Sequence, residues 1–189
     1  MKPEEKAIKG SILNNFTTAA KEQGFKKVSL DELAAGLGIS KKTVYKYFPG
    51  KKQLVAASLK KINSEMDDLV KDILESPQPT RELMIKALTG IFMYMSANFN
   101  LIQDMHRYYP EQWTAFDKQR AARIKQAEQL IQRGIDQGQF KNIDPRIVSH
   151  SYIAAVQTVI NPGFLKNKDI NFDDAYKALI QIFLNGVLI

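Results

Sequence analysis

The chain has 189 residues, of which 44% are hydrophobic and 25% charged, the composition of an ordinary soluble protein. It contains no cysteine, which excludes disulfides, a thiolate nucleophile and a cysteine-built zinc site. The start, MKPEEKAIKG, lacks the apolar segment of a signal peptide, and no apolar run reaches the ~18 to 20 residues that span a bilayer. We therefore expect a cytoplasmic protein with no membrane association.

The net charge of +7 is distributed unevenly along the chain. Residues 1–61 carry 13 lysines and 5 acidic residues, a net charge of +8, whereas residues 62–189 carry 14 basic and 15 acidic residues, a net charge of −1. A basic module attached to a nearly neutral body indicates a polyanionic partner for the first third of the chain. A solvated lysine-rich surface is the plainer alternative.

Two helices joined by a tight turn are predicted after a first helix at about residues 4–23. Ser29-Leu30-Asp31-Glu32 has the capping-box form and opens a short second helix. Gly38 supplies a residue that takes positive φ, and Ser40 can cap a third helix that runs through Tyr47. The pattern is helix, glycine-containing turn, helix.

Such a unit can place its second helix in the major groove of DNA. Val44 and Phe48, four residues apart, should face inward and leave the N-terminal part of this helix exposed. Lysines supply charge for phosphates, and threonine and tyrosine hydroxyls supply hydrogen bonds; the alternative for the tyrosines is that they pack in the core. The predicted DNA-binding residues are Ser29, Ser40, Lys41, Lys42, Thr43, Tyr45, Lys46, Tyr47, Lys51 and Lys52.

A long fourth helix is predicted from Lys51 to about Leu74, after the Pro49-Gly50 break. Two lysines at a helix N-terminus oppose the macrodipole at a cost of ~0.3 to 1 kcal/mol each. A phosphate bound at that terminus would reverse the sign of the effect. We therefore interpret Lys51 and Lys52 as binding residues.

Residues 24–54 resemble the N-terminal DNA-binding module of TetR-type transcriptional regulators. The resemblance implies an all-α chain: a three-helix DNA-binding domain with a helix-turn-helix, followed by a larger helical ligand-binding and dimerisation domain. We place these domains at residues 1–50 and 51–189. By position, Lys41, Lys42, Thr43 and Tyr45 would address bases, and Tyr47 and Lys51 would hold phosphates. The resemblance rests on Gly24, Ser29, Leu33-Ala34, Gly38-Ile39-Ser40, Thr43, Tyr45, Tyr47-Phe48, Lys51 and Leu54.

Three positions depart from the family pattern. Lys42 stands where the family often has glycine, Gly50 where it often has serine, and Lys52 where it often has an acid. The operator sequence therefore does not follow from the resemblance.

Three helices are predicted at about residues 80–99, 101–108 and 111–137, and they are rich in methionine and aromatic side chains. Such side chains suit a planar or lipophilic ligand, because methionine adapts its shape and rings stack. A packed core without a cavity is the alternative, and the resemblance favours an effector pocket. The candidate effector-binding residues are Met84, Leu88, Phe92, Met95, Phe99, His106, Tyr109, Trp113 and Phe116.

The last two predicted helices, about Pro145 to Ile160 and Phe172 to Leu188, carry more apolar surface than one core face uses. A second apolar stripe suggests a partner, and two copies of the hairpin could pack as a four-helix interface with two-fold symmetry. The candidate interface residues are Tyr152, Val156, Ile160, Tyr176, Ile180, Phe183 and Val187.

The sequence thus predicts a homodimeric repressor that binds a near-palindromic double-stranded DNA operator and is released by a small apolar or aromatic effector. It predicts no cofactor and no metal. It also predicts no catalysis, because Ser149-His150-Ser151 has no assignable carboxylate partner. One alternative is a basic helical interaction protein that binds nucleic acid or acidic partners without small-molecule control. Another is a helical hydrolase that uses His106 or His150.

Overall fold

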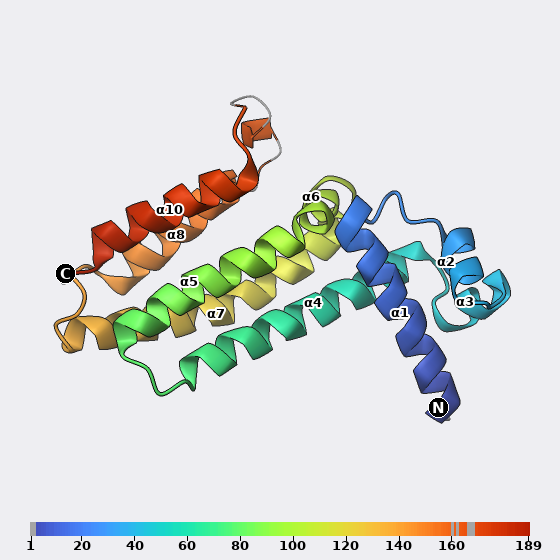
Figure 1. Cartoon of the computed structure of the whole chain (residues 1–189), viewed down its shortest axis with the longest axis horizontal. Coiled ribbons are helices and arrows are strands. Elements are labelled where there is room, and N and C mark those ends of the chain that lie inside the picture. The colour runs from blue at the N-terminus through green and yellow to red at the C-terminus, as the bar shows by residue number, and fades with distance from the viewer. Residues whose placement is uncertain (1–2, 160, 162, 166–168) are drawn as a thin grey trace. The chain divides into compact units, whose positions relative to one another are not determined.

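The computed structural model describes residues 3–159, 161, 163–165 and 169–189, and within these ranges all side chains except those of His106, Ala115, Asp117 and Gln119. Most of the described chain is helical (Figure 1). Within the described ranges, the only β pairing is an isolated antiparallel bridge between Phe140 and Leu188. The predicted all-α fold class is confirmed. The helices are α1 (Pro3–Gln23), α2 (Leu30–Gly36), α3 (Lys41–Tyr47), α4 (Lys51–Leu74), α5 (Thr80–Ala97), α6 (Phe99–Tyr108), α7 (Pro110–Asp136), α8 (Pro145–Val159) and α10 (Phe172–Val187).

The chain divides into two compact units. The first comprises Met1–Ser64 and Asn98–Phe116, and the second comprises Glu65–Ala97 and Asp117–Ile189. The first unit is larger than the predicted domain 1–50, because it also includes the start of α4, the whole of α6 and the start of α7.

In the first unit the interior is built around α1. Ile12 and Phe16 of α1 are fully buried, and Phe16 stacks on Phe25 with ring centroids 5.8 Å apart. Burying an aliphatic or aromatic side chain of this size contributes about 1.5 to 3 kcal/mol. Helix α6 packs on α1, and Leu101 and Met105 of α6 are fully buried. This interior supports the loop and the two short helices that follow α1.

In the second unit, α10 lies along α8 and also contacts α5 (Figure 1). No helix in the described ranges is long and apolar enough to cross a membrane. The core draws apolar side chains from the end of α4, from α5, α7, α8 and α10, and from the loop after α7. Its buried members are Ile73, Leu83, Met84, Leu88, Leu130, Ile131, Phe140, Val148 and Val187.

Candidate nucleic-acid interface

Two serine caps and a glycine turn determine the geometry of α2 and α3. Ser29 Oγ accepts a hydrogen bond from the backbone N–H of Glu32 at 3.4 Å, and Ser40 Oγ accepts one from the N–H of Thr43 at 3.1 Å. Between the helices, Gly38 has φ of +64°, a conformation that residues with a side chain rarely adopt. Both predicted N-caps and the predicted turn are confirmed.

Helix α3 separates an apolar face from an exposed polar one. Val44 is fully buried and Phe48 is 4% exposed, as the sequence predicts. Lys42 is exposed and Tyr45 is 42% exposed, so the tyrosine does not pack in the core. Thr43 is half-buried beside its cap. The exposed side therefore offers an ammonium, a hydroxyl and an aromatic ring within one helical turn.

Two of the predicted DNA-binding lysines on α3 form ion pairs within the chain. Lys41 Nζ lies 2.7 Å from a carboxylate oxygen of Asp31, and Lys46 Nζ lies 3.0 Å from Glu5. In each case the hydrogen bond to the carboxylate, with its charge, raises the pKa of the lysine. The Lys46 ammonium also lies 5.2 Å from the centre of the Tyr47 ring. Exposed pairs of this kind are weak, and phosphate groups can compete for the ammonium groups.

The two lysines at the start of α4 also make contacts within the chain. Lys51 Nζ donates hydrogen bonds to the backbone carbonyls of Lys26 and Val28, both at 2.7 Å, and partial burial lowers its pKa. Lys52 Nζ lies 2.7 Å from a carboxylate oxygen of Glu111. Backbone carbonyls thus account for Lys51, whereas the Lys52–Glu111 pair is as exposed as the Lys41–Asp31 pair, so a phosphate can compete for Lys52 as well. Lys51 stabilises the α1–α2 loop through these two hydrogen bonds.

A capped helix, a positive-φ glycine turn and a second helix with an exposed basic and aromatic face define a helix-turn-helix DNA-binding regulator. The family model described as bacterial regulatory proteins, tetR family, matches residues 17–58. The chain is 25% identical over 185 residues, 93% of each chain, to the uncharacterised HTH-type transcriptional regulator YvaF of Bacillus subtilis. Over residues 17–58, the chain therefore has the DNA-binding module of the tetR family of bacterial regulatory proteins.

Solved structures share the whole fold at low sequence identity. A transcriptional regulator of the TetR family from Agrobacterium tumefaciens superposes with a TM-score of 0.77 at 14% identity, covering 98% of this chain and 100% of that one. A regulator from Saccharomonospora viridis, solved in complex with choline, superposes with a TM-score of 0.79 at 15% identity, covering 97% and 99% of the two chains. The likeness extends well beyond the helix-turn-helix.

The predicted effector-binding residues fall into both units. In the second unit, Met84 and Leu88 are buried in the core cluster, so they serve packing first. Phe92, half-buried, lies against Tyr176 with ring centroids 5.2 Å apart. In the first unit, Trp113 stacks on Phe116 at 6.1 Å. Met95, Phe99 and Tyr109 are half-buried, and the side chain of His106 lies outside the described residues.

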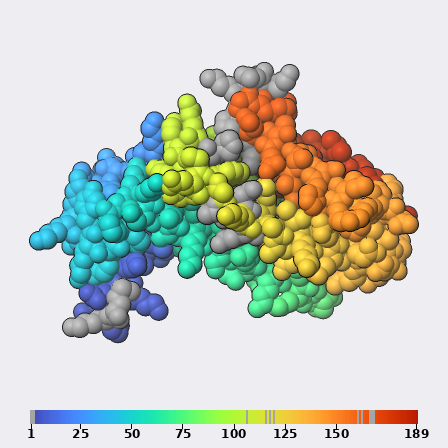
Figure 2. Space-filling model, turned by 180° about the vertical axis from the view of Figure 1, so that it is seen from behind, coloured from blue at the N-terminus to red at the C-terminus, as the bar shows by residue number. Residues whose placement is uncertain are grey.

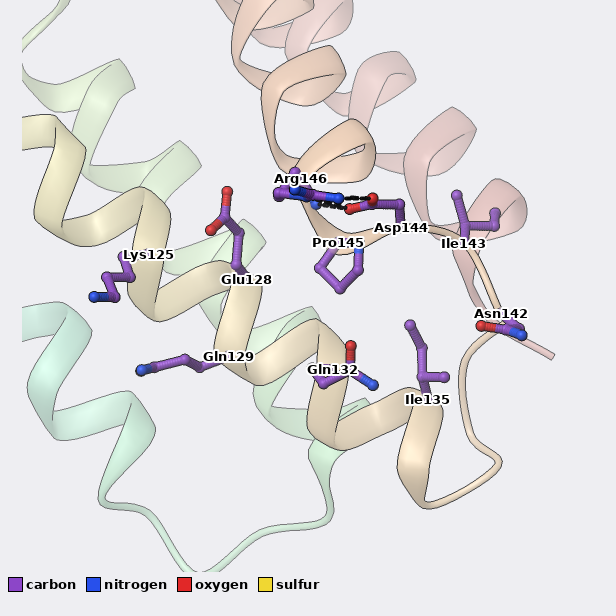
Figure 3. Close-up of a pocket in the computed structure, with 10 residues that line it drawn as sticks. All are labelled: Lys125, Glu128, Gln129, Gln132, Ile135, Asn142, Ile143, Asp144, Pro145 and Arg146. Carbon is purple, nitrogen blue, oxygen red and sulfur yellow. Dashed lines mark hydrogen bonds and ion pairs between the residues drawn. The ribbon is translucent and has the colours of Figure 1, made fainter.

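A groove of about 600 Å³ lies on the second unit, where the last part of α7 meets the start of α8. These two segments lie side by side in Figure 2, and Figure 3 shows the groove's lining. Seven of the ten lining residues have polar side chains, and none of the nine predicted effector residues is among them. The lining residues are Lys125, Glu128, Gln129, Gln132, Ile135, Asn142, Ile143, Asp144, Pro145 and Arg146.

Beside this groove, Ser149, His150 and Glu128 approach one another without forming a catalytic triad. His150 Nδ1 lies 2.9 Å from the carbonyl oxygen of Arg146, which can only accept, so Nδ1 carries the proton in this bond. The same Nδ1 faces Ser149 Oγ at 3.2 Å, and it therefore cannot act as the base for that hydroxyl. Ser149 is 4% exposed and donates to Glu128 at 3.1 Å. This cluster is a hydrogen-bonded support for α8, not a nucleophile.

Two predicted interface residues were assigned to the wrong face of α10. Tyr176 is fully buried and Val187 is 5% exposed within a single chain, so neither can contact a partner. Tyr152, Ile180 and Phe183 are half-buried against the same core. Val156 is half-buried, and Ile160 lies outside the described residues. Exposed apolar side chains on these two helices include Ile147 on α8, 62% exposed, and Ile182 on α10, 71% exposed.

Proposed function

We propose that this regulator is a repressor that binds a near-palindromic operator as a homodimer and is released by a small apolar or aromatic effector. The observation that carries the proposal is the outer face of α3, where Lys42 and Tyr45 are exposed while Val44 and Phe48 anchor the helix. Because its partner is DNA, we place the protein in the cytoplasm and assign it a regulatory, not a catalytic, role.

In this proposal the N-terminal half of α3 enters the major groove. Lys42 donates to guanine or phosphate oxygens, and the Tyr45 ring contacts a thymine methyl or donates its hydroxyl to a base edge. Thr43 can donate to a base or a phosphate. We assign Lys41, Lys46, Tyr47 and the caps Ser29 and Ser40 to contacts with the DNA phosphate backbone.

The proposed dimer explains how a short recognition helix gains affinity. Two recognition helices must lie about one duplex turn apart, roughly 34 to 36 Å, to meet both halves of a near-palindrome. Isologous contact requires a face that is apolar and exposed in one chain. Ile147 on α8 and Ile182 on α10 are apolar and exposed in this way, and we propose them for the interface in place of Tyr176 and Val187.

The effector proposal is supported by half-buried aromatic and methionine side chains. Phe92 and Met95 in the second unit, and Trp113 and Phe116 in the first, present surfaces on which a planar compound can stack. The choline complex of the Saccharomonospora viridis regulator indicates that a small molecule can occupy this fold. An effector releases DNA only by binding the DNA-incompetent conformation more tightly, so operator DNA must weaken effector binding by the same factor.

In vitro selection with the purified chain tests the proposal. We expect recovery of a near-palindromic consensus and a preference of about 1,000-fold or more for that duplex over random DNA of equal length, the lower end of typical specificity ratios. Equal affinity for both duplexes would favour the alternative, a basic protein that binds nucleic acid without sequence preference. An aromatic compound that changes Trp113 fluorescence and lowers affinity for the selected duplex in parallel would support effector control.

A further inference from the structure

Helix α6 belongs to the same compact unit as the helix-turn-helix. A polar stripe on α6 faces the α1–α2 loop, which precedes the helix-turn-helix. Asn100, Asp104 and Tyr108 are spaced four residues apart and therefore share one face of α6. All three contact the end of α1 or the loop between α1 and α2. None of them is on the helices that would contact DNA.

Asn100 caps the last turn of α1. Its Nδ2 donates to the carbonyl oxygen of Glu22 at 2.9 Å and to that of Lys21 at 3.3 Å. The last carbonyls of a helix have no partner within the helix, so an outside donor stabilises them. The contact is to backbone atoms and fixes where α1 ends.

Asp104 fixes the loop that follows. Its Oδ2 accepts a hydrogen bond from the backbone N–H of Lys26 at 2.7 Å. Gly24 has φ of +84°, and a Cβ at that position would lie 2.5 Å from the same oxygen. Glycine is thus required here both for its backbone conformation and for the close approach of the carboxylate.

The same loop is held from a second side. Lys51 at the start of α4 donates to the carbonyls of Lys26 and Val28, so the two peptide groups of Lys26 are bound by α6 and by α4. The Lys26 ammonium also lies 4.4 Å from the centre of the Tyr108 ring. Val28 is directly followed by Ser29, the N-cap of α2, so any displacement of the loop passes straight into α2 and α3.

We propose that Asn100 and Asp104 are positioning residues for DNA recognition, which set the orientation of α3 by fixing the backbone of the α1–α2 loop. The separation of two recognition helices is fixed by the duplex repeat, so a small rotation of the module is amplified into a mismatch with the second half-site. Loss of either residue therefore weakens binding to the correct sequence more than binding to DNA in general.

Two variants of Asp104 distinguish positioning from charge or simple support. Asp104→Asn keeps an acceptor oxygen in place and removes the charge, whereas Asp104→Glu keeps the charge and displaces the acceptor by one methylene against Gly24. Positioning predicts that Asp104→Asn binds the selected duplex within about threefold of wild type, and that Asp104→Glu and Asn100→Ala lose at least tenfold. Gln103→Ala, next to Asp104 but off the stripe, is the matched control.

The measurements are affinities for the duplex selected by the wild-type chain and for random DNA of equal length, with urea unfolding and hydrogen exchange at the loop amides. Support is a loss confined to the selected duplex, with faster exchange at Lys26 and wild-type unfolding midpoints. The reverse order, Glu tolerated and Asn not, would overturn the proposal, as would losses equal on both duplexes or proportional to lost stability. A wild-type chain that selects no sequence would remove the proposed function and this inference with it.

Discussion

The structure of the helix-turn-helix is determined by local interactions, whereas that of the α8–α10 hairpin depends on packing against distant segments. In the first, Ser29, Gly38 and Ser40 act on backbone groups within three residues of themselves. In the second, the side chains of α10 are sorted between core and solvent by packing against distant segments. Tyr176 and Ile182 are both apolar, yet one is fully buried and the other 71% exposed. Local signals determine where helices end, but not which of two apolar stripes faces inward.

Paired tyrosine hydroxyls explain why the face of α10 that carries Tyr176 is the buried one. Tyr152 donates its hydroxyl proton to the Tyr176 hydroxyl at 3.2 Å, and the Tyr152 ring lies 4.7 Å from that of Phe183. Burial raises the pKa of both tyrosines, which keeps the pair neutral. A tyrosine can be buried when its hydroxyl finds a partner, and here each supplies the other's. The outer stripe with Ile182 has no such anchor.

Val187→Glu is expected to unfold the second unit, which would confirm that this stripe is core. Val187 is 5% exposed in the apolar cluster, and an uncompensated buried charge costs on the order of 3 to 5 kcal/mol, a large part of the 5 to 15 kcal/mol that stabilises most domains. Circular dichroism and urea unfolding provide the measurement. A folded Val187→Glu monomer would instead restore the interface first predicted from the sequence.

Ile182→Glu should leave each chain folded and separate the proposed dimer. The side chain is 71% exposed, so the change in folding free energy should stay within about 0.5 kcal/mol. A symmetric interface would place the new charge near its own copy. We expect monomers in sedimentation and a loss of roughly 100-fold or more in affinity for the palindrome, because the second half-site is no longer linked. Lys177→Glu, exposed on α10 but on another side of the helix, controls for charge alone, and intact dimers of Ile182→Glu would exclude Ile182 from the interface.

The contrast between these regions also marks how far the sequence could predict the molecule. For the helices given above other than α2 and α3, the first and last residues agree with the predicted ones to within two residues. They do so because periodicity and Gly, Pro or cap residues act locally. Val44 and Phe48 were likewise assigned correctly to the buried face. Asn100 and Asp104 could not be recognised, since their partners are backbone atoms some 78 residues away in the chain. The position of Lys51 at a helix N-terminus indicated a binding partner, but the sequence could not show that backbone carbonyls of the same chain occupy this ammonium.

Within α3, replacing base-facing residues should separate specificity from affinity. Tyr45→Ala is expected to lower affinity for the selected duplex by roughly 5- to 150-fold, corresponding to ~1 to 3 kcal/mol for a base contact, with little change on random DNA. Lys42→Ala should weaken both duplexes and reduce the magnitude of the salt slope by about one, if Lys42 contacts phosphate. Gel-shift titrations over a salt series measure both quantities. A Tyr45→Ala variant with unchanged specificity would remove this residue from the readout.

The smallest expected effect concerns the ion pair between α2 and α3. Asp31 and Lys41 are both largely exposed and lie 2.7 Å apart, so DNA phosphates must compete with the carboxylate for this ammonium. Asp31→Asn removes the competitor and a negative charge near the duplex, and we expect affinity to rise about two- to fivefold on selected and random DNA alike. The gain should disappear at high salt, where exposed charges are screened. Glu32→Gln, the neighbouring acid on α2, removes the same charge without the pair and should give a smaller gain. If Asp31→Asn instead lowers affinity for the selected duplex alone, the carboxylate orients Lys41 toward a base, and the local ordering seen at the two serine caps extends to the recognition side chains themselves.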